Sequence, residues 1–385
     1  MKIGILTQPL HNNYGGLLQN YALQQILLKM GHTPITIDHK AKHFPCWRVL
    51  LFNIKMYLYC FLNPKKYSRP HYVPTIKEDT IIREYIIGFI DKYISHSDKC
   101  TSTSDFIKVS QDDKIESFIV GSDQCWRPKY NNHLEDMYLS FARDLPVKKK
   151  IAYAASFGTD EWEYTEEQTL EFAKLLKCFD LVTVREYSAV NLCKTHFGVN
   201  AIHVLDPTML LLKKDYISII ESENVPVSDG NLFNYFLDPT SKKIELVNRV
   251  AKKNNMKPFQ VLPKYNQDHR TRSDVKKRIE ECIYPSPVAW LRAFHDAEMT
   301  IVDSFHGMVF SIIFNKPFWV IGNKGRGLSR FISLLTDFGL DDRLLLDTDD
   351  MANVNFNKPI DWIKVNEKLI QKRNYSIGLL SKTLN

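Results

Sequence analysis

Short runs of apolar residues alternate with segments of helical periodicity through the first half of the chain. Residues Ile3–Thr7 form the first apolar run, and after a polar loop with two glycines apolar residues recur at helical spacing from Leu23 to Met30. Further strands are predicted at Pro34–Asp38, Ser117–Val120, Ile151–Ala155, Leu181–Val184 and Ile202–Leu205, with a crossover helix at Tyr187–His196. This alternation is typical of an α/β architecture with a parallel sheet.

A second α/β pattern begins after a cluster of turn-forming residues between Leu211 and Gly230. We therefore expect two Rossmann-like domains, residues 1–212 and 213–385, with a ligand cleft between them at the carboxyl ends of the strands. The elements predicted after the break are strands at Leu232–Phe236, Phe259–Leu262, Thr300–Val302 and Phe318–Ile321, and helices at Lys242–Lys253, Pro287–Ala297 and Gly307–Phe314. A final helix, Trp362–Leu380, is expected to pack back on the N-terminal domain.

The composition is that of a globular protein rather than of a disordered or fibrous one. The chain has 385 residues, 44% of them hydrophobic and 25% charged, and at roughly 100–200 residues per domain this length suits two domains. A formal net charge of +7 is too mild to indicate nucleic-acid binding. It suits an anionic small substrate or an anionic membrane surface.

The cysteines and the apolar segments bear on the cellular compartment. Seven scattered cysteines without a Cys-x-x-Cys pair predict a reduced, cytoplasmic protein with no thiolate zinc site. The first residues have the pattern of a strand and lack the apolar length of a signal peptide. The best membrane candidate, Val49–Leu62, is interrupted by Asn53 and Lys55 and is shorter than the ~20 residues of a spanning helix. We expect a soluble or peripheral protein.

Residues 44–72 interrupt the first domain with a different composition. Aromatic residues alternate here with cations, namely Trp47, Phe52, Tyr57, Tyr59 and Phe61 with Arg48, Lys55, Lys65, Lys66 and Arg69. One interpretation is a helical excursion that packs on the domain. The other is an interfacial segment whose aromatic side chains meet lipid headgroups while its cations meet anionic lipid, at the cytoplasmic face of the inner membrane.

A loop with two adjacent glycines joins the first strand to the first helix. Asn13, Tyr14, Gly15 and Gly16 lie here, where glycine lets the backbone approach a ligand and the helix N-terminus offers free N–H groups. The loop lacks the Gly-x-Gly-x-x-Gly pattern of dinucleotide-binding proteins. We take these four residues as candidate acceptor-binding residues, although tight strand–helix turns use glycine in any case.

The strand at Phe118–Val120 ends in a dense polar set. Asp123 is a candidate general base for a hydroxyl group, Ser122 and Gln124 are candidates to orient that hydroxyl, and Trp126 is a candidate to stack on a sugar face. The alternative is that Ser122 or Asp123 only caps a helix.

Arg185 follows another apolar strand, so it emerges where a ligand would lie. Arginine suits bidentate binding of a carboxylate or phosphate. The alternative is a structural salt bridge with Glu186 or Asp206.

The sharpest local signal is a strand, a small polar set and a helix in direct succession at residues 301–314. Ser304, His306 and Gly307 lie at this junction, and His306 falls at or near a helix N-terminus, beside N–H donors suited to an anion. A histidine in this position can serve as a general acid or as a phosphate ligand.

A glycine-rich loop with three cations follows at residues 322–330. Lys324, Arg326 and Arg330 suit an anion cradle, and the alternative is a solvated basic loop. Asp347-Thr348-Asp349 has the form of an Asp-x-Asp metal motif, but it lies in a late acidic stretch and we interpret it as a solvated loop. No metal site is expected.

Taken together, the motifs resemble the polysaccharide pyruvyltransferase family over about residues 1–340, most closely its members from bacterial capsule and exopolysaccharide gene clusters. The resemblance is carried by their order: Asn13-Tyr14-Gly15-Gly16 with Leu18-Gln19-x-Tyr21-Ala22-Leu23, Gly121-Ser122-Asp123-Gln124-x-Trp126, Val184-Arg185-Glu186, Asp206-Pro207-Thr208, Asp303-Ser304-Phe305-His306-Gly307 and Asn315-Lys316-Pro317-Phe318.

The resemblance implies a fold like that of the two-domain B-type glycosyltransferases. It implies an enzyme that moves a pyruvyl group from phosphoenolpyruvate to two hydroxyls of one sugar as a cyclic ketal, with release of phosphate and without a metal or other cofactor. The acceptor in bacteria is often carried on undecaprenyl diphosphate. His306 matches the family's important histidine and Arg185 its donor-binding arginine, and Ser304, Gly307, Lys324, Arg326 and Arg330 would complete the donor site.

Two other function classes remain open from the sequence. A B-type glycosyltransferase that uses a nucleotide sugar would share the fold and the anion loop. A non-catalytic glycan- or lipid-binding envelope protein would need only the cleft and the aromatic segment, but the combination of Asp123, Arg185 and His306 argues against it.

Overall fold

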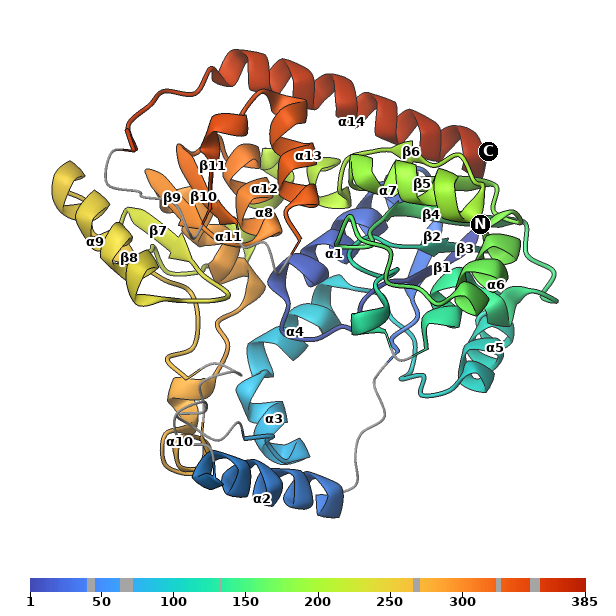
Figure 1. The fold of residues 1–385 in the computed structure, drawn as a ribbon, viewed down its shortest axis with the longest axis horizontal. Helices are drawn as coiled ribbons and strands as arrows, with labels where there is room; N and C mark the ends of the chain where they lie inside the picture. Colours follow the sequence, from blue (N-terminus) through green and yellow to red (C-terminus); the bar gives the residue numbers. More distant parts are fainter. Residues whose placement is uncertain (40–45, 63–71, 132, 266–270, 323–326, 347–353) are drawn as a thin grey trace.

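The computed structural model describes the chain apart from residues 40–45, 63–71, 132, 266–270, 323–326 and 347–353 (Figure 1). The predicted Lys324, Arg326 and Asp347-Thr348-Asp349 lie outside the described residues. We call residues 1–212 the N-terminal half and residues 213–385 the C-terminal half.

The N-terminal half contains a six-stranded parallel sheet in the order β2-β1-β3-β4-β5-β6. Its strands are β1 (Lys2–Leu6), β2 (Thr33–Thr36), β3 (Ser117–Val120), β4 (Lys149–Ala155), β5 (Leu181–Val184) and β6 (Ile202–His203). Its helices are α1 (Tyr14–Lys29), α2 (Cys46–Leu62), α3 (Ile76–Ile82), α4 (Glu84–Tyr93), α5 (Thr103–Asp112), α6 (Glu166–Leu176) and α7 (Tyr187–Leu192). The central strand β3 is fully buried, in keeping with its three consecutive apolar residues after Ser117.

The C-terminal half contains a five-stranded parallel sheet in the order β11-β10-β9-β7-β8. Its strands are β7 (Leu232–Tyr235), β8 (Pro258–Phe259), β9 (Met299–Val302), β10 (Phe318–Gly322) and β11 (Leu344–Leu346). Its helices are α8 (Lys213–Ser222), α9 (Ser241–Asn254), α10 (Arg272–Lys277), α11 (Pro287–Asp296), α12 (Phe305–Ile313), α13 (Ser329–Phe338) and α14 (Trp362–Leu384). Two parallel sheets with helical crossovers confirm the predicted α/β class.

Some element bounds differ from the prediction. The strand predicted at Phe259–Leu262 is the two-residue β8 in the structure. The first helix begins at Tyr14, well before Leu23, where the helical spacing of apolar residues begins. The helix predicted from Gly307 begins at Phe305, because the side chain of Ser304 accepts a hydrogen bond from the Gly307 N–H and so caps it.

The strand order reverses between β1 and β3 in the first sheet and between β7 and β9 in the second. Loops leaving such neighbouring strands diverge and open a crevice at the carboxyl ends. Residues 121–123 follow β3 and residues 303–306 follow β9, so both polar motifs leave a sheet at its switch point.

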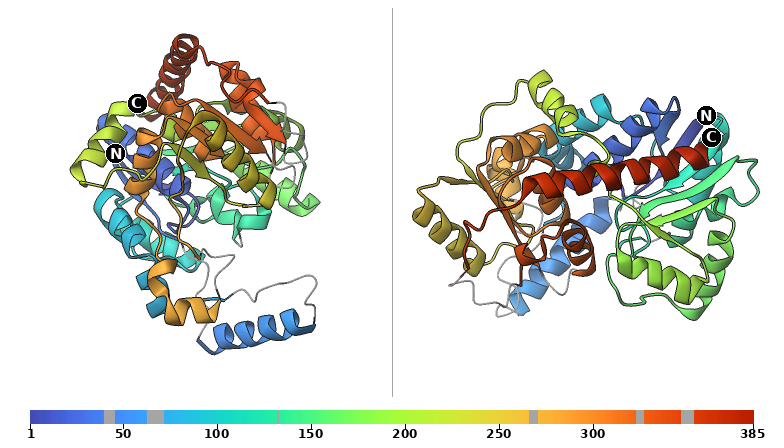
Figure 2. Two further views of the ribbon diagram at one scale, coloured as in Figure 1. Left: turned by 90° about the vertical axis from the view of Figure 1, so that its left-hand side faces the viewer. Right: turned by 90° about the horizontal axis from the view of Figure 1, so that it is seen from above.

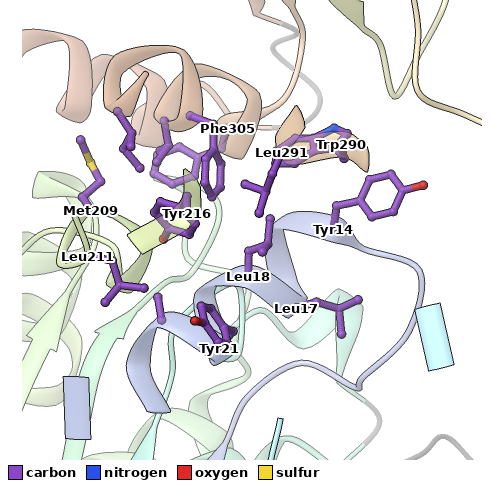
Figure 3. Close-up of a cluster of buried hydrophobic side chains, with 14 of the residues drawn as sticks. Tyr14, Leu17, Leu18, Tyr21, Met209, Leu211, Tyr216, Trp290, Leu291 and Phe305 are labelled. Atoms are coloured by element: carbon purple, nitrogen blue, oxygen red, sulfur yellow. The ribbon is translucent and has the colours of Figure 1, made fainter. Parts of the chain in front are cut away.

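A shared hydrophobic cluster joins the two halves (Figure 3). Tyr14 in the first turn of α1 is fully buried, its ring lies 5.8 Å from that of Trp290, and its hydroxyl donates a hydrogen bond to the Pro285 carbonyl at 2.8 Å. The expected acceptor contact of Tyr14 is therefore wrong, since the ring is part of the core between the halves.

Helix α14 runs along both halves (Figures 1 and 2). Its Arg373 donates to the carbonyls of Met209 at 2.8 Å and Leu211 at 3.2 Å, and its Lys372 pairs with Asp337 of α13 at 2.7 Å. The last helix is thereby attached to the end of the N-terminal half and to the C-terminal half.

Helix α2 stands away from the body of the molecule, at the end where α3 and α10 also lie (Figures 1 and 2). Its buried Asn53 is held by hydrogen bonds with the backbone of Val73. Most of its described side chains are exposed. Among the helices that the structure describes, none combines the length and hydrophobicity that crossing a bilayer requires.

Candidate active site

His306 lies in the first turn of α12, directly after β9, as the strand–helix junction predicted. Its side chain is nearly buried. Gly307 packs its backbone so closely that an added Cβ atom would lie 2.7 Å from Ser304 Oγ. Ser304 and Gly307 thus shape the helix start that presents the histidine.

The N-terminal half covers one side of His306. A Cβ atom added to Gly15 in α1 would lie 2.1 Å from His306 Nδ1, so glycine is required for this approach. Of the loop residues predicted to bind an acceptor, Gly15 instead supports the imidazole. The exposed Asn13 caps α1 by accepting a hydrogen bond from the Gly16 N–H at 3.2 Å.

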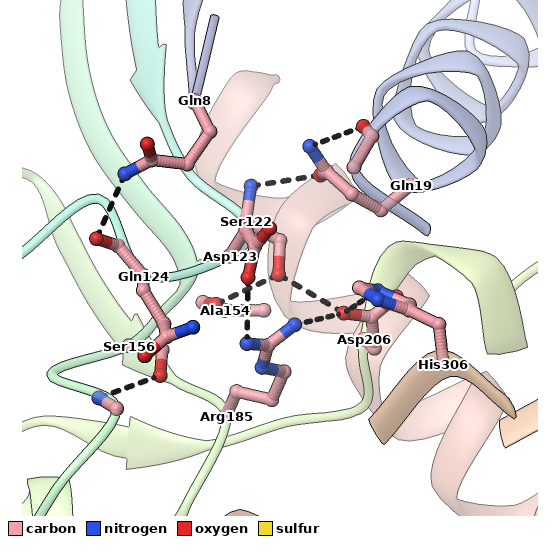
Figure 4. A network of polar contacts seen from close by, with 12 residues as sticks. Gln8, Gln19, Ser122, Asp123, Gln124, Ala154, Ser156, Arg185, Asp206 and His306 are labelled. Carbon is pink, nitrogen blue, oxygen red and sulfur yellow. Dashed lines mark hydrogen bonds and ion pairs between the residues drawn. The ribbon is translucent and has the colours of Figure 1, made fainter. Parts of the chain in front are cut away.

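Asp206 is the centre of the polar network around His306 (Figure 4). Its Oδ2 accepts from Arg185 Nη1 at 2.8 Å and from Ser122 Oγ at 3.1 Å, and lies 3.5 Å from His306 Nε2. Its Oδ1 accepts from the hydroxyl of Thr208 at 2.7 Å. Burial alone would raise the pKa of Asp206, but the charges of His306 and Arg185 and the hydrogen bonds it accepts hold that pKa well below its usual range.

Arg185 bridges two buried carboxylates. Its Nη1 pairs with Asp206 and its Nη2 with Asp123 Oδ1 at 3.1 Å, so the salt bridge to Asp206 that the sequence left open is present. Its Nε and the Nε2 of His306 are both buried and make no hydrogen bond to any residue that the structure describes. Arg185 Nε is therefore a buried donor without a partner among the described residues, whereas His306 Nε2 faces the Asp206 carboxylate.

Asp123 is paired rather than free. Besides Arg185, it accepts a hydrogen bond from Asn13 Nδ2 at 3.3 Å. Burial opposes its ionisation, but Arg185, His306 and Arg330 lower the pKa of Asp123 below its ordinary value. A carboxylate with a lowered pKa is a weak base, which argues against the predicted role as general base and favours positioning of Arg185.

A second guanidinium approaches from the C-terminal half. Arg330, in the first turn of α13, is buried, and its Cζ lies 5.8 Å from the ring centre of Phe305, which Arg185 Cζ approaches to 4.4 Å. Burial and the charge of Arg185 lower the pKa of Arg330 to about 10. A bound anion would relieve this repulsion, so the predicted involvement of Arg330 in an anion site has geometric support.

Ser122 and Trp126 do not face a ligand. Ser122 is fully buried and its hydroxyl contacts the Ala154 carbonyl and Asp206. Trp126 is also fully buried, stacks on Tyr138 with ring centres 5.3 Å apart, and donates its indole N–H to the Met137 carbonyl. The expected stacking of Trp126 on a sugar is therefore wrong, because its ring belongs to the core.

Gln124 and Glu186 organise the loop after β4. Gln124 accepts from Arg127 at 3.3 Å, and its side chain lies where a Cβ atom on Gly158 would be. Glu186 accepts from Ser156 Oγ at 3.0 Å and from the Phe157 N–H at 2.9 Å, and burial raises its pKa. This loop also meets the C-terminal half, since a Cβ atom on Gly327 would lie 1.9 Å from the Gly158 carbonyl oxygen.

Sequence reasoning named Asp206 only as an alternative salt-bridge partner of Arg185 and did not place it beside His306, although the network depends on it. The signal was present, because Asp206-Pro207-Thr208 follows a strand and was one of the ordered motifs. Among the described residues, no group of three or more histidine, cysteine, aspartate or glutamate side chains is arranged to hold a metal ion.

Comparison with models of protein families identifies one family. A family model described as polysaccharide pyruvyl transferase matches residues 13–325. No curated relative matches the chain significantly.

Several solved structures are similar to this chain at low identity. The N-terminal domain of trehalose-6-phosphate phosphatase from Candida albicans is 9% identical over 100% of this chain and 96% of its own, with a TM-score of 0.48. UDP-GlcNAc 2-epimerase from Methanocaldococcus jannaschii is 13% identical over 97% and 93%, with a TM-score of 0.45. An alpha-glucosyltransferase in complex with UDP and DNA is 10% identical over 99% and 90%, with a TM-score of 0.42. The fold assignment itself rests on the two parallel sheets.

Proposed function

The chain belongs to the polysaccharide pyruvyl transferase family and is a transferase, and we propose that it moves a pyruvyl group from phosphoenolpyruvate to two hydroxyls of a sugar in surface-polysaccharide biosynthesis. The proposed reaction uses phosphoenolpyruvate as co-substrate and requires no metal or other cofactor. The product is a cyclic ketal and inorganic phosphate.

The observation that carries the proposal is the group of buried nitrogens around Phe305 and Asp206. Arg185 Nε is buried without a hydrogen-bond partner among the described residues, His306 Nε2 is buried 3.5 Å from Asp206 Oδ2, and Arg330 lies on the same aromatic ring as Arg185. Phosphoenolpyruvate carries a carboxylate and a phosphate, and guanidinium groups bind both in forked geometry. We assign Arg330, together with Arg185, to the donor, because both guanidinium groups lie on the ring of Phe305 beside His306.

We assign the proton transfers to His306. In the first step its imidazolium donates a proton to the methylene carbon of phosphoenolpyruvate, and a sugar hydroxyl oxygen bonds to the carbon that carries the phosphate. The hydroxyl proton returns to His306. In the second step the carbon–oxygen bond to phosphate breaks, the second hydroxyl closes the ketal, and its proton leaves with the phosphate.

Asp206 and Gly15 position the imidazole in this scheme. The carboxylate of Asp206 lies 3.5 Å from Nε2, while Gly15 packs against the other side of the ring at Nδ1. Asp123 holds Arg185 through its Nη2. The base role that the sequence suggested for Asp123 is replaced here by this positioning role.

We propose that the acceptor is a glycan intermediate carried on a lipid diphosphate such as undecaprenyl diphosphate, reached by peripheral contact with the inner membrane. Helix α2 supports this. Its described side chains include exposed Leu50, Leu51, Phe52, Ile54, Leu58, Tyr59, Phe61 and Leu62. Exposed Lys55 lies on the same helix, and exposed Arg272, Lys276 and Lys277 belong to α10 at the same end of the molecule. Apolar and aromatic side chains beside cations suit an anionic lipid surface.

A thermal-shift and phosphate-release experiment tests the function. Phosphoenolpyruvate is expected to raise the Tm of the wild type, as ligand at a hundredfold excess over its Kd stabilises by about 2.7 kcal/mol. The shift should vanish in Arg330→Ala and persist in Arg143→Ala, which removes an exposed arginine. His306→Gln should keep the shift but lose phosphate release in the presence of an acceptor glycan. A shift with UDP-sugars alone would indicate a nucleotide-sugar glycosyltransferase, and glycan binding without phosphate release would indicate a non-catalytic protein.

A further inference from the structure

One face of α13 lies against the segment that joins β5 to α7. Arg330, Ser333 and Asp337 are buried and occur at positions i, i+3 and i+7 of this helix, so they share that face. The first residue of α7, Tyr187, donates its backbone N–H to Ser333 Oγ at 3.0 Å and its hydroxyl to Asp337 Oδ1 at 2.7 Å. Because Arg185 precedes Tyr187 by only two residues, the segment that carries one donor arginine is bonded to the helix that carries the other.

These two contacts satisfy groups that would otherwise lack a partner. The N-cap residue of α7, Glu186, makes no side-chain capping bond, so Ser333 supplies the acceptor that the Tyr187 N–H does not find in its own helix. The side chain of Asp337 is 3% exposed and also pairs with Lys372 of α14 at 2.7 Å. A buried carboxylate needs such donors, since an unpaired charge in the interior costs free energy. The last turn of α13 is therefore attached to the N-terminal half.

His203 of β6 connects Asp337 with the backbone of Arg185. Its ring stacks on that of Tyr187 with centres 4.1 Å apart, and its Nε2 lies 3.1 Å from the Arg185 carbonyl oxygen. A carbonyl only accepts, so Nε2 carries the proton of the neutral ring. Its Nδ1 lies 3.8 Å from Asp337 Oδ2, which has no hydrogen-bond partner among the described residues. We call Tyr187, His203, Ser333, Asp337 and Lys372 the Asp337 cluster.

The opposite end of the same face of α13 brings two like charges together. The guanidinium carbons of Arg185 and Arg330 lie 4.4 and 5.8 Å from the ring centre of Phe305. Burial and the charge of Arg185 lower the pKa of Arg330 to about 10. Without a bound anion, this repulsion favours displacement of α13 away from β5, and the hydrogen bonds of the Asp337 cluster oppose that displacement.

We propose that the Asp337 cluster is a positioning cluster that sets the spacing of Arg185 and Arg330 for a ligand with both a carboxylate and a phosphate. The proposal deepens the proposed function and rests on it for the identity of that ligand. Two like charges that the fold already holds in place need not be brought together when the ligand binds, which improves affinity. Breaking the cluster is therefore expected to weaken the binding of phosphoenolpyruvate, although neither arginine is changed.

Isothermal titration calorimetry with phosphoenolpyruvate and with inorganic phosphate tests the spacing. Loss of a hydrogen-bonding group typically costs about tenfold in affinity, so Asp337→Ala should raise the Kd of phosphoenolpyruvate by about that factor and Tyr187→Phe by several-fold. Inorganic phosphate has one anionic group instead of two, and its Kd should change by less than about twofold. Tyr187→Phe keeps the ring on His203 and is expected to fold.

A conservative variant and a control on the same helix complete this experiment. Asp337→Asn keeps an acceptor for the Tyr187 hydroxyl and offers an N–H group to His203 Nδ1, so it should bind phosphoenolpyruvate nearly as the wild type does. Thr336→Ala removes a hydrogen bond to Asp341 on the exposed face of α13 and should change neither Kd. Wild-type binding by Tyr187→Phe and Asp337→Ala, or equal losses for both ligands, would overturn the proposal.

A second measurement needs no ligand and separates this proposal from the proposed function. If the cluster holds two repelling groups together, breaking it relieves the repulsion in the wild type but not after Arg330→Gln. Tyr187→Phe should therefore lower the Tm more in the Arg330→Gln background than in the wild type, and additive losses would contradict the coupling. If this coupling is present but the wild type binds no phosphoenolpyruvate, the positioning of the two arginines stands and the pyruvyl transfer is refuted.

Discussion

The backbone of Gly15 in α1 lies so close to His306 in α12 that an added Cβ atom would stand 2.1 Å from the imidazole Nδ1. The two residues belong to different halves of the chain. The position of the candidate catalytic ring is therefore fixed by the way the halves pack, and not by α12 alone.

Gly15→Ala is expected to displace His306 while leaving both sheets intact. A misplacement near 1 Å at a reacting group costs on the order of 100-fold in rate, so phosphate release should fall by about that factor with little change in circular dichroism. Gly88→Ala is the matched control, because a Cβ atom there meets nothing within 4 Å. The control should keep full activity and gain roughly 0.5–1 kcal/mol from its helical position. Full activity of Gly15→Ala would contradict the assignment of His306.

Arg185→Ala is expected to lower stability rather than only ligand affinity. The substitution leaves Asp123 and Asp206 buried without their shared cation, and breaking a buried pair in this way costs about 3–5 kcal/mol. Chemical denaturation measures this loss directly. Asp206→Asn should cost less in the Arg185→Ala background than in the wild type, and strictly additive losses would show that the two side chains are uncoupled.

Because of Asp136, the free energy of unfolding is expected to fall as pH rises from about 4 to 6. Its pKa in the folded chain is about 6 against an ordinary 3.8, so the folded state holds a proton that the unfolded state has already lost. The raised pKa of Asp136 lowers the free energy of unfolding by at most about 3 kcal/mol at pH 7. Asp136→Asn should therefore raise the Tm by a few degrees at pH 7.5 and flatten this part of the pH profile. An unchanged profile would place the carboxyl in a solvated setting.

Charge placed on α2 should release the protein from lipid. The double variant Leu58→Glu/Phe61→Glu changes two exposed apolar side chains of this helix and is expected to reduce co-sedimentation with phosphatidylglycerol-containing vesicles several-fold. Leu170→Glu changes a leucine of α6 that is equally exposed and should have no effect. The alternative is that α2 binds a second copy of the chain. In that case the wild type does not co-sediment with vesicles but elutes as a dimer, and the double variant elutes as a monomer.

The architecture could be predicted because apolar residues recur at different spacings in strands and in helices. The run Ser117–Val120 is a strand with the predicted bounds, and the strand–polar–helix succession placed His306 at a helix start. Both inferences use only neighbours in sequence. The salt bridge of Asp206 with Arg185 was one alternative from the sequence, but its contacts with His306 and Ser122 were not predicted, because these residues come from elements far apart in the chain.

The errors at Tyr14 and Trp126 have one cause. An aromatic residue next to a polar motif has the same sequence pattern whether its ring faces a ligand or the core. Tyr14 meets Trp290 of the other half and Trp126 meets Tyr138, and both contacts depend on tertiary packing that the sequence does not display.

Helix α14 limits how the molecule can open. Arg373 is tied to the carbonyls of Met209 and Leu211 at the end of the N-terminal half, and Lys372 is tied to Asp337 in the C-terminal half. Translation of the halves away from each other would break these ties together, whereas a small rotation about the helix preserves them. The contacts of the last helix therefore favour rotation about its own axis over translation of the halves, and cutting the chain before Trp362 would remove these contacts and leave the shared hydrophobic cluster to hold the halves together.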